Sequence, residues 1–87
     1  TYIGKAKGNS NYPTIQEGDI MIIRADLPIL NNCMAIVSVN NNKFTAKRID
    51  TKNKKLIPDN KKHPVIEINE EDVIRTMGVV KHIIRDL

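Results

Sequence analysis

Short apolar runs, rich in valine and isoleucine and separated by clusters of turn residues, most constrain the fold of this chain of 87 residues. β-Branched side chains favour strands, whereas Gly, Pro, Asn and Asp favour the turns between strands. The runs recur about every ten residues. They predict strands at residues 2–7, 19–25, 33–39, 43–49, 54–58, 65–68 and 73–87. We therefore expect a single small, mostly β domain, spanning residues 1–87, with antiparallel strands.

Three of these segments allow a more detailed prediction. The run at 19–25 is almost continuously apolar, which favours a strand covered on both faces. The asparagines at 40–42 predict a hairpin turn, because asparagine tolerates left-handed backbone geometry. The last run, 73–87, also contains a helical stripe of apolar residues. Its many Val and Ile residues, together with Gly78, favour a strand instead.

The composition narrows the class of protein. The formal net charge is +4, and much of the excess lies at residues 52–62, a stretch without the aromatics that stack on single-stranded nucleic acid. The single cysteine, Cys33, cannot form an internal disulfide and is predicted to be a small buried apolar residue. No apolar run approaches the ~20 residues of a membrane helix. We expect a cytoplasmic protein without a membrane span, and a piece of a longer chain, because Thr1 already begins a strand-like segment.

The usual cofactor and metal motifs are absent from the sequence. There is no glycine-rich phosphate loop, no HExxH and no CxxC, so we expect neither a cofactor nor a metal. The two histidines, His63 and His82, lie outside any recognisable catalytic context, although a Ser-His-Asp triad with either one stays open. The remaining candidates for catalysis are Ser10 and Lys47.

Ser10 and Lys47 occupy positions that suit a nucleophile and a base. Ser10 lies in a turn-rich segment after a predicted strand, where the backbone N–H groups of Asn9 and Ser10 can form an oxyanion hole. Alternation along a strand places Thr45 and Lys47 on one face. A lysine base must be neutral, which burial favours, and Thr45 could hold its amine in line. From the residues alone, a solvated lysine on a strand surface remains the alternative.

Two motifs in the correct order carry a resemblance to a known family. The nucleophile motif of the LexA, UmuD and phage-repressor peptidases resembles the run Gly8-x-Ser10-x-x-Pro13-Thr14-Ile15-x-x-Gly18-Asp19. The general-base strand of that family resembles residues 45–49, and the Ser10–Lys47 spacing matches the family's usual interval. The likeness extends over residues 2–85. Its beginning, residues 2–6, looks most like the UmuD branch, whereas residues 13–15 look more like the phage repressors.

This resemblance implies a curled, partly barrel-like antiparallel domain that forms a homodimer. It also implies self-cleavage of an upstream segment, with Ser10 as nucleophile, Lys47 as general base and Thr45 orienting the lysine. In such proteins, a recombinase–single-stranded-DNA filament formed after DNA damage promotes the cleavage. Repressor members then release operator DNA, which they bind through an N-terminal domain, and UmuD-like members act with a translesion polymerase.

The chain departs from the family pattern beside the nucleophile. The family usually has Asp-Ser-Met, and here the run is Asn9-Ser10-Asn11. Asn11 would either place a polar side chain beneath the turn or swing outward and loosen it. The turn at 40–42 is also one residue longer than usual. Two other functions stay open: a non-catalytic dimerisation or regulatory module, and a fragment of a type I signal peptidase, which shares the Ser-x-x-Pro-Thr motif.

Overall fold

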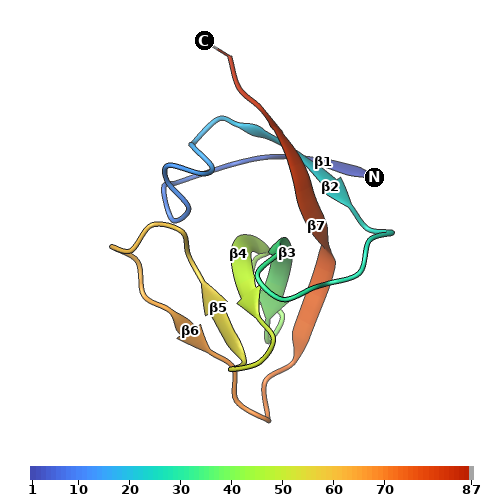
Figure 1. Cartoon of the computed structure of the whole chain (residues 1–87), viewed down its shortest axis with the longest axis vertical. Coiled ribbons are helices and arrows are strands. Elements are labelled where there is room, and N and C mark those ends of the chain that lie inside the picture. Colours follow the sequence, from blue (N-terminus) through green and yellow to red (C-terminus); the bar gives the residue numbers. More distant parts are fainter. Residues whose placement is uncertain (87) are drawn as a thin grey trace.

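The chain folds into seven β-strands, and the structure, a computed structural model, describes residues 1–86. Figure 1 shows the strands wrapped around a small interior. The strands are β1 (Tyr2–Lys5), β2 (Ile20–Arg24), β3 (Met34–Val39), β4 (Thr45–Asp50), β5 (Lys55–Ile57), β6 (Ile66–Glu67) and β7 (Ile74–Ile84). Each lies within a segment that the sequence predicts to be a strand, apart from β4, which ends one residue later. Among residues 1–86 there is no helix of the length and apolarity that crossing a bilayer requires.

All seven strands form one antiparallel sheet in the order β1-β2-β7-β3-β4-β5-β6. The prediction of a mostly β, antiparallel domain is therefore confirmed. The sheet curls, with β1 and β2 at one end of the molecule and β5 and β6 at the other (Figure 1). It is an open sheet rather than a closed barrel, since β1 and β6 are its two edges.

The long strand β7 joins the two ends of the sheet. Its first half pairs with β3 and its second half with β2, and Val79 lies opposite a residue of each strand. Register shifts in both ladders mark β-bulges, which bend a strand. A Cβ on Gly78 would lie 2.7 Å from the carbonyl oxygen of Arg24, so only glycine allows this close approach. The ambiguous last segment is thus a strand, as predicted; its last residue, Leu87, lies outside the described residues.

The core lies on both faces of β3, whose residues Met34 to Ser38 are all buried. One cluster comprises Ala6, Ile15, Met21, Ile23, Met34, Ile36 and Ala46, and the other Ala35, Val37, Ile49 and Leu56. The prediction that 19–25 is covered on both faces is wrong. Burial alternates along β2, because only the inward face of this outer pair of strands meets the core. Cys33 is half-buried against the second cluster.

The predicted hairpin turn at 40–42 connects β3 to β4. Asn40 and Asn41 have φ angles of 53° and 63°, the left-handed geometry that asparagine tolerates. The turn is held from outside as well, because Asn40 accepts a hydrogen bond from the amide of Val73 and donates one to Asp72. This turn fixes where β4 begins, and β4 carries Thr45 and Lys47.

Candidate active site

The segment between β1 and β2 forms the turn that carries Ser10. Its ends are joined by hydrogen bonds between the backbones of Ala6 and Asp19 and of Gly18 and Ala6, at 2.8 and 2.9 Å. Inside it, the amide of Tyr12 donates to Asn9 and that of Ile15 to Asn11. The Ile15 side chain is buried in the first core cluster and anchors the segment. Ser10 is left half-buried on the surface of this segment, residues 6–19, which we call the Ser10 turn below.

Strand β4 brings Thr45 and Lys47 to the Ser10 turn. The register places Lys47 opposite Ala35 and Thr45 opposite Val37, so the two side chains share one face, as predicted. The ladder between β4 and β5 begins only at Arg48. The edge of β4 before Arg48 therefore has no strand partner on that side and faces the Ser10 turn. Lys47 itself is buried, with 7% of its surface exposed.

The amine of Lys47 contacts three oxygen atoms. Its Nζ lies 3.4 Å from Oγ of Ser10, 3.0 Å from Oγ1 of Thr45 and 3.2 Å from the carbonyl oxygen of Ala46. No carboxylate is among these hydrogen-bond partners within residues 1–86, so burial lowers the pKa of Lys47 without an opposing charge. The structure thus brings together the three side chains that the sequence singles out. Their catalytic roles stay predictions.

The backbone around Ser10 leaves donors available. Within the described part of the chain, hydrogen bonds of the turn use the amides of Gly8, Tyr12 and Ile15, and none uses those of Asn9 and Ser10. Gly8 has a φ of 75°, which favours glycine, and open space surrounds the position of a Cβ there. A substrate backbone can therefore approach the two free amides closely.

Within residues 1–86, neither histidine is hydrogen-bonded to the Ser10 hydroxyl. Nε2 of His63 lies 2.9 Å from Oδ1 of Asn9, and no hydrogen bond joins it to Ser10 within residues 1–86. His82 is an exposed residue of β7, opposite Ile22. The geometry brings a lysine, and neither histidine, into contact with the candidate nucleophile.

A second loop holds the Ser10 turn from the other side. The amide of Asn60 donates to the carbonyl oxygen of Ser10 at 3.0 Å, and its side chain donates to that of Asn9 at 2.9 Å. Sequence reasoning misses this support. The loop follows β5, and nothing in its composition indicates that it folds back on a turn about fifty residues earlier in the chain.

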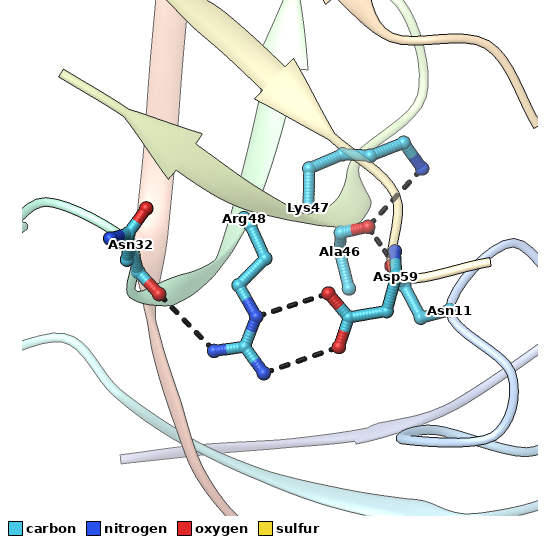
Figure 2. Close-up of polar contacts among 6 residues, drawn as sticks. All are labelled: Asn11, Asn32, Ala46, Lys47, Arg48 and Asp59. Atoms are coloured by element: carbon cyan, nitrogen blue, oxygen red, sulfur yellow. Dashed lines mark hydrogen bonds and ion pairs between the residues drawn. The ribbon is translucent and has the colours of Figure 1, made fainter. Parts of the chain in front are cut away.

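Asn11 points inward, which answers one question left open by the sequence. Only 5% of its surface is exposed. Its Nδ2 donates to the carbonyl oxygen of Ala46 at 2.8 Å, and its Oδ1 accepts from the amide of Asp59 at 3.1 Å. Figure 2 shows the Asn11 and Lys47 side chains meeting at the same Ala46 oxygen. Both polar atoms of the side chain are hydrogen-bonded beneath the turn, so it connects the turn to β4 rather than loosening it.

A cavity of about 210 Å³ opens beside Ser10. Buried apolar side chains of the first core cluster line it, together with Lys5, Lys7, Gly8, Ser10, Asn11, Phe44 and Thr45. Within residues 1–86, no group of three His, Cys, Asp or Glu side chains is placed to hold a metal ion. The site therefore consists of a hydroxyl, an amine, two free amides and an adjoining cavity lined by both apolar and polar side chains.

Comparison with known families identifies the family of this chain. A family model described as Peptidase S24-like matches residues 1–81, nearly the whole chain. The match covers both the Ser10 turn and the β4 strand that carries Lys47. The chain belongs to the Peptidase S24-like family of serine peptidases.

Proposed function

We propose that this chain is a self-cleaving peptidase domain in which Ser10 is the nucleophile, Lys47 the general base and Thr45 the residue that orients the base. One observation carries the proposal. The amine of a buried lysine lies 3.4 Å from the Ser10 hydroxyl, and all the hydrogen-bond partners that it has among residues 1–86 are uncharged. Such surroundings favour the neutral amine that a base requires.

The three oxygens around the Lys47 amine can accommodate its neutral form. A neutral amine has two N–H donors and one lone pair. The carbonyl oxygen of Ala46 can only accept, and it takes one N–H. Thr45 Oγ1 takes the second. The lone pair then remains for the O–H of Ser10, which is the direction in which the proton must move.

The reaction follows from this arrangement. Ser10 Oγ attacks the carbonyl carbon of the scissile peptide bond while its proton passes to Lys47 Nζ, and the free amides of Asn9 and Ser10 stabilise the negative oxygen that forms. Lys47 then gives the proton to the leaving nitrogen as the C–N bond breaks. A water molecule hydrolyses the resulting ester, first losing a proton to Lys47, and the Ser10 hydroxyl is restored.

We take the substrate to be a segment of the same protein upstream of this domain. The cavity beside Ser10 is lined by the apolar side chains of Ile15, Met21, Ile23, Ile36 and Ala46. An apolar side chain next to the cleaved bond would fill it, and the open backbone around Gly8 admits an extended peptide.

The biological setting in this proposal rests on the sequence resemblance alone. The domain acts as a homodimer in the cytoplasm, and a recombinase–single-stranded-DNA filament formed after DNA damage promotes the cleavage. The UmuD-like beginning of the chain favours a product that acts with a translesion polymerase. Alternatively, the full-length protein is a repressor, and self-cleavage makes it release operator DNA.

The alternative of a non-catalytic dimerisation module predicts a solvated Lys47 with an ordinary pKa. Lys47 is instead buried, and burial lowers its pKa. The observed site therefore favours catalysis over this alternative.

The test is self-cleavage of the full-length precursor, incubated from about pH 7 to about pH 10, and separately with an activated recombinase filament. We expect one upstream cut, faster as the pH rises because Lys47 loses its proton, and none in Ser10→Ala or Lys47→Ala. A wild-type precursor that stays intact under both conditions, while folded, would refute the proposal.

A further inference from the structure

Asn11 is a buried polar residue for which the proposed reaction has no use. Its side chain makes one hydrogen bond to β4, at the carbonyl oxygen of Ala46, and one to the loop after β5, at the amide of Asp59. Both bonds have good lengths, 2.8 and 3.1 Å, so the amide orientation is fixed. A buried amide held at both ends is a precise means of placing a hydrogen-bond donor.

The oxygen that receives this donor is the one beneath the Lys47 amine. Ala46 O accepts from Asn11 Nδ2 at 2.8 Å and from Lys47 Nζ at 3.2 Å (Figure 2). A carbonyl oxygen has two lone pairs, so both donors fit. The shorter bond draws electron density from the oxygen and brings the positive end of the Asn11 amide close to Nζ. Both effects make the oxygen a poorer partner for a charged lysine.

In the described part of the chain, no charged group is hydrogen-bonded to the Lys47 amine, so none opposes the effect of Asn11 directly. Asp59 is held by Arg48 through bonds of 3.1 and 3.2 Å. His63 is bound to Asn9, and Lys7 lines the neighbouring cavity. None of these groups is hydrogen-bonded to Nζ within the part of the chain that the structure describes. Within residues 1–86, the Ala46 oxygen is thus the one carbonyl among the three uncharged oxygens that the amine contacts.

We propose that Asn11 is a positioning residue for the base. By sharing the Ala46 carbonyl, it weakens the stabilisation that this oxygen gives a protonated Lys47, and it holds the amine toward Ser10. This inference rests on the proposed function, because it concerns the same lysine. Removing the Asn11 amide leaves Ala46 O to Lys47 alone, so the lysine should hold its proton more tightly.

The first experiment follows the proton on Lys47 without using cleavage. The full-length precursor carries Ser10→Ala, its lysines are labelled with ¹³C at Cε, and the Lys47 signal is followed by NMR from about pH 6 to about pH 12, a range that brackets free lysine. Adding Asn11→Leu, a change of similar shape, should move the inflection to higher pH. The added apolar surface alone would move it to lower pH, so the direction distinguishes the two causes.

Asn60→Leu is the matched control. It removes the 2.9 Å bond from Asn60 to the Asn9 carbonyl, so it loosens the same turn without touching Ala46. We expect the Lys47 inflection to stay in place in this variant. An equal upward movement in both variants would mean that Lys47 responds to loosening of the turn, and would overturn the role of Asn11.

The second experiment measures self-cleavage against pH in precursors that retain Ser10. Asn11→Leu should slow cleavage about threefold to tenfold near pH 7 and approach the wild-type rate at high pH, where Lys47 is neutral in both. Asn60→Leu should lower the rate by the same factor at every pH. A pH-independent loss in Asn11→Leu, or an unmoved or lowered NMR inflection, would overturn the proposal.

Failure of Asn11→Leu to fold and failure of the wild-type precursor to cleave itself each have their own readout. If Asn11→Leu does not fold, Asn11→Met replaces it, since an unbranched side chain adapts to irregular space, and the same upward movement is expected. If the wild-type precursor never cleaves itself, the proposed function fails, and the NMR titration still decides whether Asn11 controls the proton on Lys47.

Discussion

Two buried charged residues, Asp19 and Lys47, have opposite surroundings. Asp19 is 2% exposed and receives two hydrogen bonds from Arg85, at 2.8 and 2.6 Å, and one from the amide of Gln16 at 2.7 Å. The bond from Arg85 lowers the pKa of Asp19, so its charged form is favoured. Lys47 is 7% exposed, and its hydrogen-bond partners in the described part of the chain are all uncharged oxygens. Burial lowers the pKa of Lys47, so its charged form is disfavoured.

The difference separates a charge that holds the fold from one that can do chemistry. Asp19 closes the end of the Ser10 turn, and Arg85 ties it to the chain just beyond β7. Within residues 1–86, Lys47 has no such partner, although its neighbour Arg48 is paired with Asp59. A buried cation without a counter-charge weakens a fold, and proteins tolerate such strain at functional sites. The contrast therefore supports the proposed role of Lys47 as a base.

The largest expected effect comes from Lys47→Arg, which keeps the charge and removes the base. Arginine stays protonated at any pH that the protein survives, so it cannot take the Ser10 proton. Self-cleavage of the precursor should fall by about 10²–10⁴-fold, the usual contribution of a general base, and should no longer increase with pH.

Lys55→Arg is its control, because Lys55 is a half-buried strand lysine whose ion-pair partner within residues 1–86 is Glu67, at 3.9 Å. Its cleavage rate and pH profile should match those of the wild type. Retained, pH-dependent cleavage in Lys47→Arg would show that the base is another group, and the comparison with Asp19 would lose its functional meaning.

Asp19→Asn should have the next largest effect, on stability. It leaves the Arg85 guanidinium without its carboxylate and weakens the closure of the Ser10 turn, so the thermal midpoint should fall on the order of 10 °C. The folded-state pKa of Asp19 is lowered, so its contribution is present above the unfolded value of ~3.9 and is lost as the pH falls through the folded value. Thermal unfolding from about pH 2 to about pH 7 should therefore show a smaller acid loss in the variant. An unchanged midpoint at pH 7 would refute this structural role.

The sequence predicts the strands because their patterns are local. β-Branched runs and turn residues specify all seven strands to within a few residues, and the Asn40–Asn41 turn follows from the φ angles that asparagine tolerates. The common face of Thr45 and Lys47 follows from strand alternation alone. Gly78 favours a strand over a helix in the sequence, but the reason it must be glycine, the Arg24 carbonyl 2.7 Å from a Cβ, requires the packed structure.

The sequence cannot predict the contacts made by distant loops. Nothing local indicates that Asn60 would bond to the backbone of Asn9 and Ser10, or that Arg85 would pair with Asp19. Asn11 is instructive, because its residue type allows it to point inward or outward. The inward position depends on one acceptor, the carbonyl oxygen of Ala46, and one donor, the amide of Asp59. Only the folded β4 and the loop after β5 bring these two groups within reach.

Lys47→Met should have a smaller effect on stability, in the opposite direction to Asp19→Asn. It replaces a buried cation by an apolar side chain of similar length, so the free energy of unfolding at pH 7 should rise by about 0.5–2 kcal/mol, the range of single stabilising changes. In the wild type, the buried charge of Lys47 destabilises the fold at pH values below the lowered pKa of the folded state. This cost disappears as the pH rises toward ~10.4, the pKa of the unfolded state. The gain, measured by urea unfolding at pH 7 and at higher pH, should therefore shrink as the pH increases. Destabilisation at pH 7 would mean that the Thr45 and Ala46 bonds outweigh desolvation.

The smallest expected effect comes from Asp26→Asn. This variant tests whether an exposed carboxylate–arginine pair stabilises the fold as much as a buried one. A hydrogen bond from Arg24 lowers the pKa of Asp26 to about 2, yet the two side chains are 41% and 61% exposed in the order Arg24 and Asp26. Water and salt weaken an ion pair so open to solvent, and both groups remain hydrated when it is broken. The thermal midpoint at pH 7 should stay within about 2 °C of the wild type. The thermal midpoints of this variant and of Asp19→Asn are compared by calorimetry. If the midpoint of Asp26→Asn falls as far as that of Asp19→Asn, pairing with arginine, and not burial, explains the contribution of Asp19 to stability.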